Sequence, residues 1–199
     1  MSLQLCTDNS TSFQLLKVMP QPFLVHRLSP TAQQDLHSPG AFEQFVYQVP
    51  EAMKTALTVE LLSNEDVDNV IVYVKTNFAA DTLADTLNRA GITAESFHGN
   101  KSQRTRRSSA ANFENKRTRT LVVTESAASD IPTTSVRMVV NYNIPVSAET
   151  YIKRLNDHRH QQGWQGKAIS LCDPCEQGHL TNINRVLAGE IQLLKRSVA

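Results

Sequence analysis

Short apolar runs alternate with helical patterns along most of the chain, from residue 42 almost to its end. Residues 70–74, Val-Ile-Val-Tyr-Val, form a continuous apolar run of the kind found in strands that are buried on both faces, as the strands of parallel sheets are. The alternation predicts an α/β fold with a parallel sheet flanked by helices on both faces. Further strands are predicted over residues 45–49, 93–97, 120–124, 136–142 and 167–171.

The best-marked helix begins near Thr76, which can cap its amino end, and ends before Gly91, a typical C-terminal stop. Its apolar residues Phe78, Leu83 and Leu87 are expected to face the core. Other helices are predicted after Pro50, over residues 102–115 and 148–155, and after Asp173, where one or two terminal helices are expected.

Residues 1–40 differ from the rest of the chain. They combine polar residues with several prolines and only short apolar groups, which predicts an extended arm or linker. The remaining residues, 41–199, are predicted to form one domain, because a chain of that length buries enough apolar surface to fold alone.

The composition is that of a globular protein, with 40% hydrophobic and 20% charged residues. No apolar run approaches the roughly 18 residues needed to span a bilayer. The amino terminus lacks the basic and apolar regions of a secretory signal. Three cysteines, an odd number, fit a reducing compartment. We therefore expect a cytoplasmic protein that does not associate with membranes.

The net charge of +1 conceals a local concentration of basic residues. Residues 101–119 contain seven Lys and Arg side chains and a single acid, Glu114. A basic patch gains affinity for a polyanion by releasing counterions, whatever the base sequence. The alternative interpretation is an exposed helix whose arginines are simply solvated.

A parallel α/β sheet invites a search for a nucleotide site. The P-loop pattern GxxxxGK[ST] is absent, because the nearest candidate, Gly166-Lys167, has Gln161 where the first Gly belongs and Ala168 after the Lys. An Asp-Glu-Ala-Asp sequence is absent as well, which leaves no obvious carboxylate to hold the Mg²⁺ of a nucleotide. We therefore expect no cofactor and no ATP hydrolysis by these residues alone.

Six sequence segments follow one another in an order typical of one family: YQV at 47–49, VIVYVKTNFAADTLADTLNRAGI at 70–92, HGNKSQRTR at 98–106, LVVTESAA at 121–128, VVNYNIP at 139–145, and residues 151–171. Together they resemble the C-terminal RecA-like domain of the DEAD-box RNA helicases. The resemblance implies a fold related to the P-loop NTPases but without a P-loop of its own. It also implies that residues 1–40 correspond to a remnant of the first helicase domain and the interdomain linker.

The same resemblance implies an RNA-binding surface. In the family, several matching positions contact the RNA sugar-phosphate backbone, and a QxxR motif matches the pair formed by Gln103 and Arg106. We predict that this surface binds single-stranded or structured RNA weakly and without sequence preference, because half of a two-domain clamp contacts only part of the strand. The predicted RNA-binding residues are Lys75, Thr76, Gly99, Gln103, Arg104, Arg106, Arg107 and Thr124.

Two departures from the family pattern bear on ATP. Motif V of the family continues into Arg-Gly-Leu-Asp, whereas Ser-Asp-Ile-Pro follows here, so that only Asp130 remains to contact a ribose. Motif VI of the family carries two arginines that reach the phosphates on the first domain, and an ungapped alignment places Asp157 and His160 at their positions. The remnants of a nucleotide site are therefore Asp130, Arg154 and Arg159. The resemblance implies a pseudoenzyme, for which ATP and Mg²⁺ are expected only if a first domain is supplied in trans.

Other residues with metal or redox chemistry have simpler interpretations. Cys172 and Cys175 have CxxC spacing, but they stand alone at a strand-to-helix turn. His158 and His160 are two positions apart and would not share a helix face, so a solvated loop is expected rather than a metal site. Trp164 could stack on a base or anchor its own loop, and the anchor is favoured.

Three functions remain open. An RNA-binding module derived from a helicase is favoured. A protein-interaction module is the second, because the face that would dock a first domain is available to a partner. One half of an ATP-dependent helicase is the third, and the altered motif VI weighs against it. A continuous basic track from Lys75 past Arg106 to Thr124 would favour RNA, whereas an apolar patch around Asp130 and Arg159 would favour a protein partner.

Overall fold

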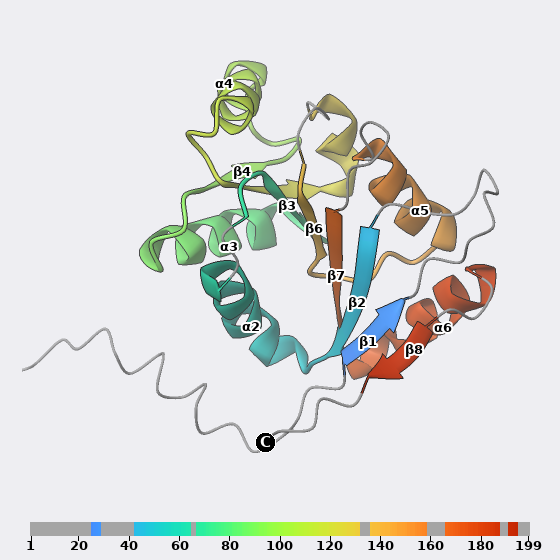
Figure 1. Ribbon diagram of the computed structural model, residues 1–199. Coiled ribbons are helices and arrows are strands. Elements are labelled where there is room, and N and C mark those ends of the chain that lie inside the picture. The colour runs from blue at the N-terminus through green and yellow to red at the C-terminus, as the bar shows by residue number, and fades with distance from the viewer. Residues whose placement is uncertain are drawn as a thin grey trace, which may run out of the picture.

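The computed structural model describes residues 25–28, 42–64, 67–131, 136–158, 166–187 and 191–194. Their strands form one eight-stranded sheet in the order β4-β5-β3-β6-β7-β2-β1-β8 (Figure 1). The first six strands of that order are parallel, as the sequence pattern predicts. Their bounds are β2 (Phe42–Gln48), β3 (Val70–Val74), β4 (Ala94–Phe97), β5 (Thr120–Thr124), β6 (Met138–Asn141) and β7 (Gly166–Cys172).

Helices cover both faces of the sheet, which confirms the predicted RecA-like α/β architecture (Figure 1). One face packs against α2 (Glu51–Asn64) and α3 (Asn77–Arg89). The other packs against α4 (Gln103–Glu114), α5 (Ala148–Asp157) and α6 (Gln177–Val186). Two short 3₁₀ helices, η1 (Glu125–Asp130) and η2 (Pro174–Glu176), follow β5 and β7. No helix within these described ranges is long and apolar enough to cross a bilayer.

The central strand β3 shows why its sequence is apolar throughout. All five of its residues are buried. Val70, Val72 and Val74 point to the side of α2 and α3, whereas Ile71 and Tyr73 point to the side of α4, α5 and α6. Because successive side chains of a strand point to opposite faces, a strand covered by helices on both sides has no polar face.

Two strands at one border of the sheet were not predicted. β1 (Val25–Leu28) pairs antiparallel with β2, and β8 (Ile191–Leu194) pairs antiparallel with β1. β1 falls inside the predicted arm, of which the other residues up to 40 lie outside the described residues. Four-residue runs carry little periodicity, and these two gain their strand hydrogen bonds from neighbours far away in the sequence. An antiparallel border on an otherwise parallel sheet is common in α/β folds.

One predicted core residue is on the wrong face of its helix. The buried face of α3 consists of Ala80, Leu83, Ala84 and Leu87, whereas Phe78 is 81% exposed. At about 100° per residue, Phe78 lies about 140° around the helix axis from Leu83. The expectation that Phe78 faces the core was therefore wrong, because it followed the apolar character of the residue rather than its angular position.

Candidate nucleic-acid interface

The carboxyl ends of three neighbouring strands bring most of the predicted RNA-binding residues together. β5 lies between β4 and β3, with Val74 of β3 opposite Thr124 of β5 and Phe97 of β4 opposite Val123 of β5. The residues that follow these strands therefore lie at one edge of the sheet. We call the surface formed by residues 75–78, 98–107 and 125–130 the carboxyl edge.

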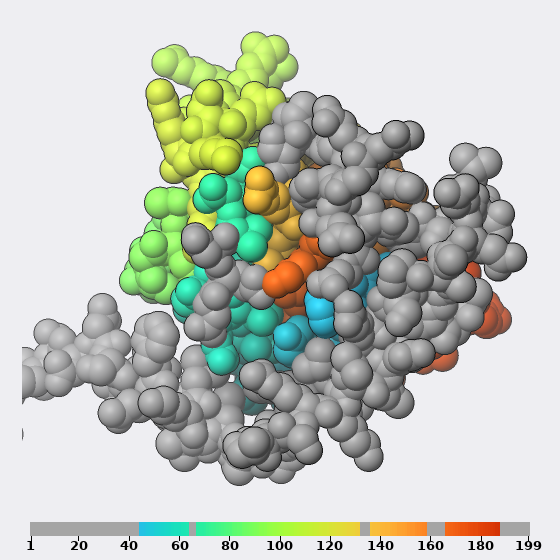
Figure 2. Space-filling view, viewed as in Figure 1, coloured from blue at the N-terminus to red at the C-terminus, as the bar shows by residue number. Residues whose placement is uncertain are grey.

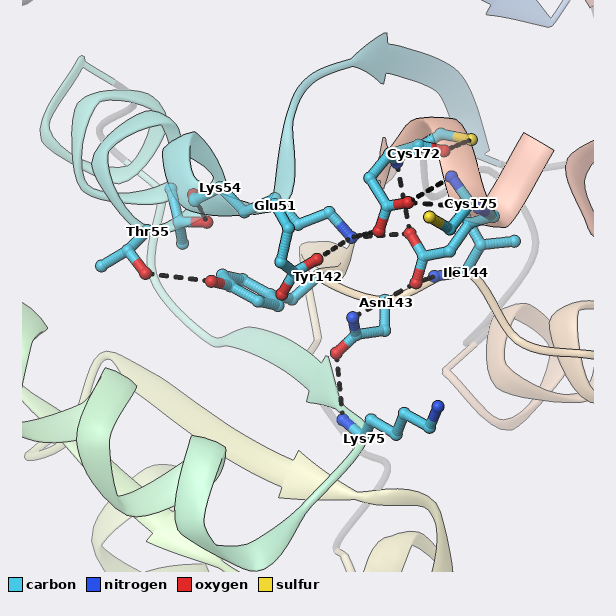
Figure 3. A network of polar contacts seen from close by, with 12 residues as sticks. Glu51, Lys54, Thr55, Lys75, Tyr142, Asn143, Ile144, Cys172 and Cys175 are labelled. Atoms are coloured by element: carbon cyan, nitrogen blue, oxygen red, sulfur yellow. Dashed lines mark hydrogen bonds and ion pairs between the residues drawn. The ribbon is translucent and has the colours of Figure 1, made fainter.

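Lys75 and Thr76 form the turn between β3 and α3 at this edge. The backbone N–H of Lys75 donates to Asn143 Oδ1 at 3.1 Å, and the exposed Lys75 side chain extends away from that contact (Figure 3). Thr76 is the N-cap of α3, and its hydroxyl accepts from the Ala79 N–H at 3.1 Å. The turn is thus held through its backbone and its cap, which leaves the Lys75 ammonium on the surface.

A buried polar network lies behind the Lys75 turn (Figure 3). Asn143 Nδ2 donates to Glu176 Oε1 at 3.2 Å, and the other oxygen of Glu176 accepts from Lys54 Nζ at 2.6 Å. Lys54 is fully buried and also pairs with Glu51 at 2.9 Å and Asp173 at 3.3 Å. The network therefore ties the Lys75 turn to α2 and η2. Sequence analysis missed Lys54, Asn143 and Glu176 as residues that support the site.

The amino ends of two helices open onto the carboxyl edge. α3 is capped by Thr76, and α4 is capped by Ser102, whose hydroxyl accepts from the Thr105 N–H at 3.1 Å. Neither helix has an acidic residue in its first turn. The partial positive charge of a helix amino end is thus not neutralised locally, and such ends bind phosphate groups readily.

Arg106 and Asp130, predicted to contact RNA and nucleotide respectively, contact each other. Arg106 Nη2 lies 3.5 Å from Asp130 Oδ2, and Arg106 Nη1 donates to the Lys101 carbonyl at 3.4 Å. The Arg106 side chain is only 24% exposed. Gln103, Arg104 and Arg107 are exposed on the same helix. In Figure 2 the yellow-green atoms around α4 project at one end of the molecule.

The basic stretch between residues 101 and 119 does not form a single patch. Lys101, Arg104, Arg106 and Arg107 lie at or near the start of α4, whereas Lys116, Arg117 and Arg119 follow its end. The 12 residues of α4 span about 18 Å. Only the first group belongs to the carboxyl edge, so the local charge there is smaller than the sequence suggests.

Asp81 of α3, just outside the carboxyl edge, has a basic partner within it. Asp81 accepts from Lys101 Nζ at 2.9 Å and from Ser96 Oγ at 2.5 Å, and its Oδ1 lies 3.1 Å from His98 Nε2. Burial alone would raise the pKa of Asp81, but the hydrogen bonds from Lys101, Ser96 and His98 outweigh it and hold the pKa well below its usual value. Asp81 is therefore ionised at neutral pH, and its negative charge is balanced by the Lys101 ammonium.

The carboxylates in and around the edge pair with Lys101, Arg106 and Arg154, so other basic side chains of the edge have no carboxylate partner. Within the described residues, Lys75, Arg104 and Arg107 have no carboxylate partner. Gly99 is exposed, and a side-chain carbon at its position would meet open space. Among the described residues, the carboxyl edge thus combines basic side chains that have no carboxylate partner with an exposed glycine, Gly99, whose backbone a ligand can approach closely.

Thr124 does not reach this surface. Its side chain is buried with 4% of its area exposed, and its hydroxyl lies 3.4 Å from that of Ser126. Thr124 was predicted to contact RNA, but it is buried, whereas the next two residues, Glu125 and Ser126, are exposed. A continuous basic track from Lys75 to Thr124 is therefore absent among the described residues.

Arg154, predicted as a nucleotide remnant, is engaged inside the domain. It is 6% exposed, donates from Nε to Glu125 at 2.7 Å and from Nη1 to Asn141 Oδ1 at 2.7 Å, and lies 4.3 Å from the centroid of the Tyr73 ring. It therefore joins α5 to η1 and β6. Its role toward a nucleotide stays a prediction. Arg159, His160 and Trp164 lie outside the described residues.

The cysteine pair has the geometry of a turn. Asp173 is the N-cap of η2 and accepts from the Cys175 N–H at 2.6 Å, and Glu176 completes a capping box with it. Cys172 is buried, which raises the pKa of its thiol to about 12, whereas Cys175 is exposed. His158 is buried too, with Nε2 2.7 Å from the Tyr73 hydroxyl. Among the residues that the structure describes, no group of three His, Cys, Asp or Glu side chains could hold a metal ion.

Comparison with known proteins identifies the family of this arrangement. Residues 53–156 match the family described as the helicase conserved C-terminal domain. RNA helicase CrhR of Synechocystis is 31% identical over 179 residues, which are 89% of this chain and 36% of the relative. ATP-dependent RNA helicase DbpA of Bacillus subtilis is 31% identical over 153 residues, 77% of this chain and 32% of the relative. The chain thus spans about a third of the length of these curated relatives.

Solved structures agree with the sequence comparison. The E. coli DEAD-box protein SrmB, bound to regulator of ribonuclease activity A, superposes with a TM-score of 0.66 and 28% identity over 77% of this chain and 87% of that chain. S. cerevisiae Dbp5, bound to RNA and ADP BeF3, superposes with a TM-score of 0.67 and 26% identity over 75% of this chain and 40% of that chain.

Proposed function

Since this chain belongs to the helicase C-terminal domains of the DEAD-box RNA helicases, we propose that it is a non-catalytic RNA-binding module that holds a sugar-phosphate backbone on its carboxyl edge. The observation that carries the proposal is the coincidence of three features at that edge. The turns after β3 and β4, the amino ends of α3 and α4, and the unpaired cations Lys75, Arg104 and Arg107 all lie there.

Each of these groups would contact the RNA backbone in its own way. Lys75, Arg104 and Arg107 supply mobile positive charge for phosphate oxygens. The side chains of Thr76 and Gln103 donate hydrogen bonds to oxygens of the RNA backbone, and the open backbone at Gly99 allows that strand to come close. Such contacts position a strand without reading its sequence. Arg106 joins them when it leaves Asp130. Thr124 is left out of the proposed contacts because it is buried.

The expected binding is weak and depends strongly on salt. Three unpaired cations can neutralise about three phosphates, which for a single strand predicts a slope of about −2 in log affinity against log salt. The S. cerevisiae Dbp5 chain solved with RNA and ADP BeF3 is longer, since this chain covers 40% of it.

ATP hydrolysis is not part of the proposed function. The sequence lacks a P-loop, and Arg154 is held by Glu125 and Asn141. ATP and Mg²⁺ would bind only where these residues meet a first helicase domain. A protein partner is the second candidate, since the similar domain of SrmB has been solved with regulator of ribonuclease activity A.

Fluorescence anisotropy of a labelled single-stranded RNA at low and moderate salt tests the proposal. The informative variant is Arg104→Ala/Arg107→Ala, and the matched control is Lys116→Ala/Arg117→Ala, which removes the same charge from the other end of α4. We expect saturable binding that weakens with salt, a loss of about tenfold or more in the first variant, and less than about twofold in the control.

Two results would contradict RNA binding at this edge. One is the absence of binding even at low salt, which would move the search to protein partners. The other is an equal loss of affinity in both variants, which would indicate that only the net charge matters.

A further inference from the structure

Phe78 is a large apolar side chain with no place in the core. It is 81% exposed in the first turn of α3, on the side of the helix away from Ala80, Leu83 and Leu87. Single apolar residues on a surface are common and usually need no explanation. The position of Phe78 is unusual because it lies within the carboxyl edge, two residues after Thr76 in the turn formed by Lys75 and Thr76.

Basic groups lie on two sides of the Phe78 position. Lys75 precedes it by three residues, and its side chain is exposed. Asp81 follows it by three residues, so the two are neighbours on the helix surface. The Lys101 ammonium lies 2.9 Å from Asp81 Oδ1, so the charges of this pair balance each other and Lys75 supplies the free positive charge beside Phe78. An aromatic ring close to a basic group is a combination by which proteins bind single strands, with a phosphate on the cation and a base on the ring.

We propose that Phe78 stacks against an unpaired base of an RNA strand whose phosphates lie on the Lys75 turn and the amino end of α3. This inference rests on the proposed RNA-binding function and adds to it a base contact and a preference for single strands. Stacking on a phenyl ring accepts any base, so it does not create sequence specificity. It does create a requirement for bases that are free to leave a helical stack.

The surroundings favour a nucleic-acid base over a protein partner. A protein interface has an apolar core, and docking patches on monomers are contiguous over hundreds of Å². Around Phe78 the exposed neighbours on the chain are Lys75, Thr76 and Thr82, all polar. Of the other large apolar side chains that are exposed in the described ranges, Val146 lies in the loop between β6 and α5 and Val186 lies in α6. One ring among polar groups fits one base.

An abasic probe separates stacking from phosphate binding. The affinity of the 199-residue chain would be measured by anisotropy for a labelled oligouridine and for an abasic oligomer of equal length and charge. Phe78→Ala removes the ring, and Phe78→Tyr keeps it. Because Phe78 is exposed, both variants should unfold at the temperature of the unmodified chain, which thermal denaturation checks.

We expect the unmodified chain and Phe78→Tyr to prefer oligouridine over the abasic oligomer by about fivefold to a hundredfold, and Phe78→Ala to bind both alike. Equal affinity of the unmodified chain for both oligomers would overturn the stacking contact while leaving phosphate binding intact. A preference that survives in Phe78→Ala would place the base contact elsewhere and overturn it as well. No binding of either oligomer at low salt would overturn the proposed function together with this inference.

Discussion

The guanidinium of Arg106 lies 3.5 Å from the carboxylate of Asp130, so that α4 and the end of η1 are joined by an ion pair at the carboxyl edge. Asp130 is 55% exposed at its side chain and Arg106 is 24% exposed. Any phosphate that approaches Arg106 must compete with Asp130. The acid thus reduces the positive charge that the edge offers to RNA.

Removal of this competitor should increase RNA affinity. Asp130→Asn keeps the size of the side chain and frees Arg106, and we expect binding about two- to fivefold tighter at low salt, with the gain shrinking as salt rises. The matched control is Asp68→Asn, because Asp68 pairs with Lys116 at 3.7 Å beyond the other end of α4. Anisotropy titrations of the two variants should differ, and an equal gain in both would exclude a specific role of the Arg106 pair.

Arg154 should contribute strongly to stability. Arg154→Met leaves the buried Asn141 Oδ1 without its donor and removes the partner of Glu125, and we expect a loss of about 2–4 kcal/mol in the free energy of unfolding. The neighbouring Lys153→Met is the control. It breaks only an exposed pair with Asp157 and should cost less than about 0.5 kcal/mol. Urea denaturation measures both, and similar values would show that Arg154 has no special structural role.

Asp173 should make the domain less stable in acid. Burial alone would raise the pKa of this carboxyl, but hydrogen bonds from the Cys175 amide and Lys54 hold the pKa below its ordinary value of 3.8. A carboxyl with a lowered pKa stabilises the fold above its unfolded pKa, and that contribution is lost as the pH falls through the folded pKa. Asp173→Asn can still cap η2, so its unfolding free energy should fall less steeply below about pH 4 than that of the unmodified chain. Equal slopes in denaturation series at several pH values would contradict this.

The two cysteines at the end of β7 and in η2, Cys172 and Cys175, should react very differently. Cys172 is buried and its thiol pKa is raised to about 12, whereas Cys175 is exposed. Because the thiolate is the reactive form, we expect iodoacetamide to modify Cys175 on the order of a hundredfold faster in the folded protein. Peptide mass spectrometry distinguishes the two sites. Similar rates, or a disulfide between them under mild oxidation, would revive the redox interpretation of the CxxC spacing.

The parallel sheet could be predicted from the sequence because its pattern is local. The run at residues 70–74 and the strands on either side carry their own apolar signals. The alignment of Lys75, Thr76 and Gly99 at one edge follows from parallel strands alone. β1 and β8 could not be found in this way, since their pairing joins segments far apart in the sequence. Phe78 was misplaced because its apolar character was taken as a sign of burial.

Local sequence patterns could not predict which side chains contact one another. Lysine is rarely buried, so nothing about Lys54 predicted a fully buried ammonium whose partners Asp173 and Glu176 lie more than a hundred residues away. The Asp-x-x-Glu spacing of Asp173 and Glu176 is the one local sign of that network, as a capping box. The pairing of Arg106 with Asp130 and the burial of Thr124 depend on how η1 packs after β5, which no periodicity specifies.

The border strands determine where attached segments would emerge. Val25 pairs with Tyr47 near the carboxyl end of β2, and Leu194 pairs with Val25. The chain therefore enters β1 and leaves β8 on the same side of the sheet as the carboxyl edge. With strands about 4.8 Å apart, β1 lies about 19 Å along the sheet from β3. A fluorescent tag, purification handle or fused domain joined directly to Val25 or Leu194 would therefore lie on the same side of the sheet as the carboxyl edge, where it would crowd any ligand held there.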